Sequence, residues 1–73
     1  MKADPLKTFG AHVRALRERA GLSQEALAAK AGIHRTYMGG VERGERNLTL
    51  RSLERLAERM GVDPVTLLQR PAD

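Results

Sequence analysis

Residues 23 to 44 constrain this chain most, because their punctuation predicts two short helices joined by a tight turn. Ser23 can accept a hydrogen bond from an unpaired backbone N–H and so begin a helix, and Gly32 offers the left-handed conformation that ends one. A second helix then begins near His34. The apolar sides of the two helices are Leu27, Ala28 and Ala31 in the first, and Ile33, Met38 and Val41 in the second. Both helices are too short to stand alone, so flanking helices must brace them.

This layout is that of a helix-turn-helix, a motif whose second helix enters the major groove of DNA. The second helix spans about residues 34 to 42 and carries Arg35 and Thr36 in its first turn. Arginine can present two N–H groups to O6 and N7 of guanine, and threonine can contact thymine through its hydroxyl or methyl group. The sequence therefore predicts double-stranded DNA as the partner, with Arg35 and Thr36 as base-contacting residues.

A family resemblance covers the same residues. Cro/C1-type (XRE) helix-turn-helix domains are similar to the runs LSQEALAAKAGI, the aromatic-containing helix ending in VERG, and NLTLRSLERLAERMGV. Within that group, the small controller proteins of restriction-modification systems resemble the run RTYMGGVERGERNLTLRSLE. The resemblance extends from about residue 9 to about residue 68. It implies an all-α, compact five-helix domain like that of the lambda repressor, and a homodimer that regulates its own operon from a roughly palindromic operator.

The resemblance also implies roles for individual residues. An arginine one turn before Gly21 pairs in the family with a glutamate near the end of the recognition helix, which predicts an ion pair between Arg17 and Glu42. Arg46, in the loop after that helix, would contact a base. The phosphate-contacting residues would be Gln24, Tyr37, Arg43, Asn47 and Ser52. The residues alone leave alternatives open: Tyr37 could face inward as core, and Arg46 could be an ordinary solvated side chain.

The first helix opens at Asp4 and Pro5, an N-cap and first-position pair, and Gly21 closes it. Its apolar positions recur at three and four residues, so we expect a buried stripe of Leu6, Phe9, Val13, Leu16 and Ala20. Gly10 interrupts this helix. It is expected to weaken the helix by about 1 kcal/mol relative to alanine.

A fourth helix is predicted from the cap at Thr49 to Gly61, with Leu53, Leu56, Ala57 and Met60 on its inner face. A second Asp-Pro pair opens a last helix over residues 64 to 69, which Pro71 stops. This short helix has little core to cover, so part of its apolar face is free for a partner. The predicted homodimer contact therefore comprises Val65, Leu67 and Leu68.

Two glycines distinguish the recognition helix from a typical one. Gly39 and Gly40 lie inside it, and each weakens a helix by roughly 1 kcal/mol relative to alanine. One interpretation is that the backbone approaches DNA closely at these positions. The other is a loosened helix that becomes ordered when DNA binds.

The histidines do not indicate a metal site, because His12 and His34 fall on different helices with no acidic or sulfur partner at ligand spacing. We expect His12 to face solvent or the rim of the core. His34 is a poor N-cap and is expected near a phosphate. No nucleophile lies on a strand-to-helix elbow and no phosphate-binding loop follows a strand, so neither an enzyme nor a cofactor or small-molecule ligand is predicted.

Length and charge agree with a small regulator. Seventy-three residues make one domain, and the absence of cysteine suits a reducing cytoplasm. No apolar run is long enough for a membrane span, and the N-terminus lacks a signal-peptide core. The net charge of +4 is concentrated in residues 1 to 20 and 34 to 51, which would face phosphate. The simpler alternative for this charge is a solubilising surface.

Other functions remain open on the sequence alone. A phage- or plasmid-type repressor would share the fold, and only neighbouring genes would separate it from a controller protein. An antitoxin-like interaction module would need a larger exposed apolar groove and would leave Arg35, Thr36 and Arg46 without a role. A non-specific architectural DNA-binding protein would carry more positive charge than this chain does.

Overall fold

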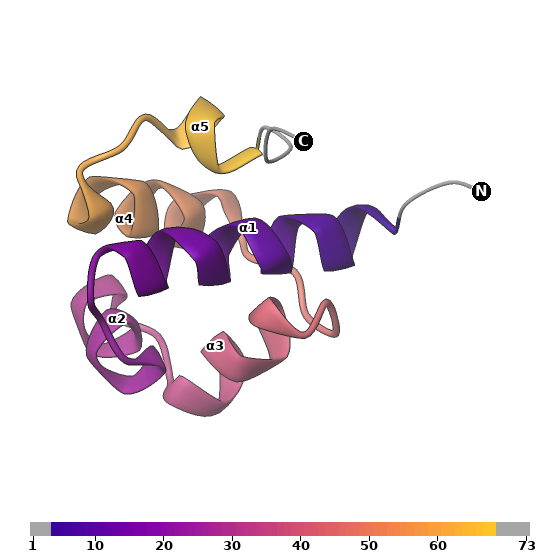
Figure 1. The fold of residues 1–73 in the computed structure, drawn as a ribbon, viewed down its shortest axis with the longest axis horizontal. Helices are drawn as coiled ribbons and strands as arrows, with labels where there is room; N and C mark the ends of the chain where they lie inside the picture. The colour runs from indigo at the N-terminus through magenta and orange to yellow at the C-terminus, as the bar shows by residue number, and fades with distance from the viewer. Residues whose placement is uncertain (1–3, 69–73) are drawn as a thin grey trace.

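Five α-helices make up the computed structural model, which describes residues 4 to 68 (Figure 1). Figure 1 shows α1 running through the centre of the molecule, with α4 and α5 on one side and α2 and α3 on the other. The helices are α1 (Pro5–Arg19), α2 (Gln24–Ala31), α3 (Arg35–Glu42), α4 (Leu50–Met60) and α5 (Pro64–Leu68). The predicted all-α, five-helix architecture is confirmed.

Side-chain caps begin the helices where the sequence predicts them. Asp4 accepts a hydrogen bond from the backbone N–H of Leu6 at 2.9 Å, and Ser23 accepts one from Ala26 at 3.0 Å. Thr49 caps α4 in the same way. Gly32 ends α2 with a φ of 72°, a left-handed conformation that residues with a Cβ adopt only under strain.

The core lies where all five helices meet, and Met38 is the member that α3 contributes. Among its members, Val13 of α1, Leu27 of α2, Leu56 of α4 and Leu67 of α5 are completely buried. Phe9 and Leu16 pack partly buried against it. The core therefore fastens α1 to both halves of the molecule.

Two predictions about α1 are wrong. Ala20 is exposed, because it is the C-cap and lies where the helix leaves the core. His12 is buried rather than at the surface, and its Nδ1 has no hydrogen-bond partner among the residues that the structure describes. Gly10, His12 and Val13 are all buried, so the buried side of α1 is wider than the predicted apolar stripe.

Gly10 has a structural role that helix propensity alone does not reveal. It is buried where α1 crosses the end of α3. A Cβ at this position would overlap the carbonyl oxygen of Val41 and lie 2.6 Å from that of Glu42. Without a side chain at Gly10, α1 can approach the backbone of the recognition helix.

The last helix begins at Pro64, as the sequence predicts. α5 ends at Leu68, and the predicted end at Gln69 and the stop at Pro71 lie outside the described residues. Within residues 4 to 68, no helix has the length and apolar character needed to cross a membrane.

Candidate nucleic-acid interface

The exposed end of α3 presents the two residues predicted to read bases. Arg35 and Thr36 occupy its first turn, and both are exposed. The helix begins there because Nδ1 of His34 accepts a hydrogen bond from the backbone N–H of Thr36 at 3.0 Å. The expectation that His34 would not cap the helix is therefore wrong: an imidazole nitrogen takes the place of the usual hydroxyl or carboxylate oxygen.

An open cleft of about 440 Å³ separates the first turn of α2 from α3. Its walls are mainly polar, and its position places the beginning of α2 beside the base-contacting candidates. The lining residues are Ser23, Gln24, Glu25, Arg35, Thr36, Gly39 and Arg43. The structure thus gathers Gln24, Arg35, Thr36 and Arg43, which are scattered along the sequence, on one face.

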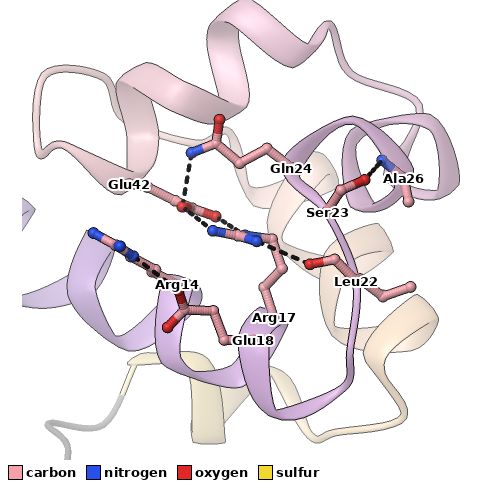
Figure 2. Close-up of polar contacts among 8 residues, drawn as sticks. All are labelled: Arg14, Arg17, Glu18, Leu22, Ser23, Gln24, Ala26 and Glu42. Atoms are coloured by element: carbon pink, nitrogen blue, oxygen red, sulfur yellow. Dashed lines mark hydrogen bonds and ion pairs between the residues drawn. The ribbon is translucent and has the colours of Figure 1, made fainter.

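A buried ion pair holds α3 against α1 (Figure 2). Nε of Arg17 donates to Oε2 of Glu42 at 2.6 Å, and Nη2 donates to Oε1 at 3.0 Å. Nη1 of Arg17 also donates to the carbonyl oxygen of Leu22 at 2.8 Å, in the turn before α2. The side chain of Glu42 is 2% exposed and that of Arg17 is 11% exposed. The structure thus contains the pair that the sequence predicts, with the paired geometry that makes arginine–carboxylate contacts strong.

The same ion pair further stabilises the charged form of Arg17. The hydrogen bond to Glu42 raises the pKa of Arg17 above its ordinary value, and this outweighs the opposing effect of burial. A cation whose pKa rises on folding stabilises the protein fully below its unfolded pKa and loses that contribution as the pH rises through the folded one. The contribution of Arg17 is therefore complete at neutral pH.

Gln24 links α2 to this pair. Its Nε2 donates to Oε1 of Glu42 at 2.9 Å, as Figure 2 shows. This hydrogen bond joins the start of α2 to the end of the recognition helix. The phosphate contact of Gln24 stays a prediction, for which the second N–H of the amide remains as a donor.

The two glycines of α3 lie beneath arginine side chains. Both are buried, and α3 is continuous through them. A Cβ at Gly40 would lie 2.7 Å from Cγ of Arg46, and one at Gly39 would lie 3.0 Å from Nη1 of Arg43. The continuous helix does not support the interpretation of a loosened helix, and close approach of the backbone to DNA stays a prediction. The glycines make room for the side chains of the loop arginines.

The loop after α3 carries further polar candidates. Arg43, Arg46 and Asn47 are exposed, and Nε of Arg43 donates to Oε1 of Glu45 at 3.2 Å. At the start of α4, Thr49 Oγ1 donates to the hydroxyl oxygen of Ser52 at 3.1 Å. That bond uses the acceptor side of the Ser52 hydroxyl, so its own hydrogen can still be donated to a phosphate. Phosphate contacts by these residues stay predictions.

Tyr37 lies between the two predicted alternatives, because it is half-buried on α3. This position suits an aromatic residue with an apolar body and a polar tip. A phosphate contact through its hydroxyl stays a prediction.

The predicted dimer contact needs a correction. Leu67 is completely buried in the core of the monomer, so it has no surface to offer a partner. Val65 is 58% exposed, while the side chain of Leu68 lies outside the described part of the chain. Sequence reasoning missed Leu50, which is 78% exposed. It lies in the first turn of α4, outside the core that Leu53 and Leu56 join.

Leu50 is one of the residues that line a mainly apolar hollow of about 320 Å³. The hollow lies between the start of α1 and the start of α4, and the loop residue Asn47 forms part of its wall.

Within residues 4 to 68, no group of three or more His, Cys, Asp and Glu side chains is placed to hold a metal ion.

Fold and surface together define a helix-turn-helix protein: a short helix, a turn at a left-handed glycine, and a second helix whose polar first turn faces outward. The family model described as a helix-turn-helix domain matches residues 8–69. The chain belongs to this helix-turn-helix family.

Several of the proteins to which the chain is similar are controller proteins. Control protein C.BamHI from Bacillus amyloliquefaciens is 43% identical over 61 residues, which are 82% of this chain and 75% of that protein. The crystal structure of the restriction-modification controller protein C.AhdI from Aeromonas hydrophila has a TM-score of 0.83 at 47% identity, covering 85% of this chain and 94% of that one. The controller protein C.Esp1396I, as a tetramer in complex with its natural 35 base-pair operator, has a TM-score of 0.77 at 35% identity, covering 90% and 87%.

Proposed function

We propose that this protein is a transcriptional regulator that binds double-stranded DNA as a homodimer and controls its own restriction-modification operon. The observation that carries the proposal is the exposed first turn of α3, with Arg35 and Thr36, on a helix fixed from behind by the Arg17–Glu42 pair. The similarity to controller proteins, one of them in complex with its operator, supports the controller role. A protein that regulates such an operon would act in the cytoplasm of a bacterium.

In this proposal α3 enters the major groove with Arg35 and Thr36 against base edges, and Arg46 contacts a further base. The phosphate contacts come from Gln24, Tyr37, Arg43, Asn47 and Ser52. These contacts would fix the register of the protein on the duplex, while the base contacts select the sequence. The fixed position of α3 matters because a base-reading side chain must arrive within hydrogen-bonding distance of a rigid target.

Binding would control transcription through occupancy, because a dimer beside a promoter can block or recruit RNA polymerase. The described residues include no separate sensing element, so the variable sensed would be the concentration of the protein itself, through dimerisation and operator filling. Two-fold symmetry of the dimer predicts half-sites about 34 Å apart, one turn of the double helix.

Operator recognition is tested by fluorescence anisotropy at physiological salt, with the DNA immediately upstream of the gene and a scrambled duplex of the same composition. We expect the upstream DNA to bind about 10³-fold or more tightly. Arg35→Ala should cost about 1 to 3 kcal/mol on the upstream DNA and relax the preference at one base pair of each half-site. Equal, weak binding of wild-type protein to both duplexes would contradict the proposal, and a uniform loss on all sequences would contradict the role of Arg35.

The homodimer contact would use Leu50 and Val65, the large apolar side chains that are exposed in the part of the chain that the structure describes. The double variant Leu50→Ser/Val65→Ser should raise the dimer dissociation constant tenfold or more, since burying such side chains contributes about 1.5 to 3 kcal/mol each. Sedimentation equilibrium measures this constant, and the variant keeps the net charge that DNA binding needs. Ala15→Ser, at an exposed position of α1, is the matched control. An unchanged dimer in the double variant would place the contact elsewhere.

A further inference from the structure

The base-contacting candidate Arg35 is held by an acidic residue of the preceding helix. Nη1 of Arg35 donates to Oε2 of Glu25 at 3.2 Å, and both side chains line the cleft between α2 and α3. The two side chains are 68% and 73% exposed. A carboxylate on a surface that faces phosphates weakens DNA binding by repulsion. Its place beside Arg35 therefore calls for a role that offsets this repulsion.

The contact leaves the arginine able to read a base. It engages Nη1, and within residues 4 to 68 no hydrogen bond engages Nε or Nη2 of Arg35. Recognition of guanine needs two N–H groups along one edge of the guanidinium, directed at O6 and N7. The edge formed by Nε and Nη2 can supply both. Glu25 and a guanine can therefore hold the same guanidinium at the same time.

From this geometry we propose that Glu25 is a positioning residue that determines the sequence specificity of Arg35; this rests on the proposed function. Arginine has a long side chain with many rotamers, and ordering it on binding opposes affinity. Because Glu25 already restricts the side chain of Arg35, less conformational entropy is lost when Arg35 binds a guanine. On a site without guanine, the contact with Glu25 keeps Arg35 from reaching a phosphate. Arg35 therefore adds little to the affinity for non-specific DNA.

Both effects raise the ratio of specific to non-specific affinity. A carboxylate that merely repelled phosphates would lower the two affinities together and leave their ratio unchanged. The Glu25→Ala variant separates these cases. Its matched control is Glu18→Ala, because Glu18 is also an exposed carboxylate, 56% exposed, paired with an exposed arginine, Arg14, but on α1 and outside the cleft.

The experiment selects duplexes from a random pool with the wild-type protein, Glu25→Ala and Glu18→Ala, and sequences the bound fractions. The strongest wild-type duplex and a scrambled duplex then serve as anisotropy probes over a range of salt concentrations. For Glu25→Ala we expect a weaker preference at one guanine of each half-site and a fall of about fivefold in the affinity ratio, the scale of an exposed ion pair. The slope of log affinity against log salt on the scrambled duplex should steepen by about 0.9, because Arg35 would then contact a phosphate.

The double variant Glu25→Ala/Arg35→Ala should bind with the same ratio as Arg35→Ala, because Glu25 acts through Arg35. Equal increases on both duplexes, or a change no larger than that of Glu18→Ala, would overturn the inference while leaving operator binding intact. A wild-type selection without any enriched sequence would refute the proposed function, and the role of Glu25 with it.

Discussion

Gly10→Ala is expected to destabilise the protein by about 3 kcal/mol, the upper end of the usual cost of overpacking a core. The new Cβ would overlap the carbonyl oxygen of Val41 and lie 2.6 Å from that of Glu42. Both are backbone atoms at the end of α3, so they cannot turn aside as a side chain would. The higher helix propensity of alanine, about 1 kcal/mol, offsets only part of this.

Gly39→Ala is the matched control, because Gly39 is another buried glycine inside a helix. A Cβ there would lie 3.0 Å from Nη1 of Arg43 and 3.6 Å from Oε1 of Gln24, both at the ends of flexible side chains. We expect Gly39→Ala to be neutral or to stabilise by up to about 1 kcal/mol. Urea unfolding at matched protein concentration measures both free energies. Equal free energies of unfolding for the two variants would show that α1 and α3 can move apart to accommodate the Cβ without loss of stability.

Much of the fold could be predicted from local sequence because its helix ends depend on short-range chemistry. Asp4, Ser23 and Thr49 each cap a helix through a backbone N–H two or three residues ahead. The left-handed glycines at Gly32 and Gly61 end α2 and α4 for an equally local reason. Such interactions involve residues that are adjacent in the chain, so they can be read without knowing the tertiary structure.

The errors arose where the outcome depends on which helices pack together. The burial of His12 and Leu67 reflects the position of each helix against the core, and spacing along one helix does not reveal where the core ends. Leu50 shows the opposite case, since it follows the apolar spacing of α4 and yet is exposed. Gly10 was expected only to weaken its helix, and it lies where α1 packs against the backbone at the end of α3.

For the candidate site, sequence reasoning and the family resemblance supplied the residues, and the structure supplied their neighbours. Arg35 and Thr36 are exposed on the first turn of α3, where the pattern placed them. The contact between Arg35 and Glu25 could not be predicted, because ten residues and a turn of unknown geometry separate them. The positions of charged residues along the sequence do not indicate which carboxylate an arginine contacts.

Loss of the ion pair between Arg17 and Glu42 is expected to destabilise the protein about as much as Gly10→Ala does. Replacing one partner leaves the other charge buried and unpaired, which typically costs about 3 to 5 kcal/mol. Arg17→Met should fall near the lower end, about 3 kcal/mol, because Glu42 keeps its hydrogen bond from Gln24. Gly10 and Arg17 are seven residues apart and so lie on one face of α1, and both contact the end of α3. Loss of the pair should therefore weaken the same helix contact that Gly10 permits.

A double-mutant cycle separates the pair from its surroundings. The charge-neutral double variant Arg17→Met/Glu42→Gln should lose less stability than the two single variants added together, with a coupling energy of about 1 to 3 kcal/mol in urea unfolding. The exposed pair Arg14–Glu18, whose side chains are 63% and 56% exposed, gives the matched cycle Arg14→Met/Glu18→Gln. Its coupling should be about 0.3 to 0.5 kcal/mol, because water and salt screen exposed charges. Equal coupling in the two cycles would mean that burial adds nothing to the Arg17–Glu42 contact and that packing around Gly10 alone fixes the recognition helix.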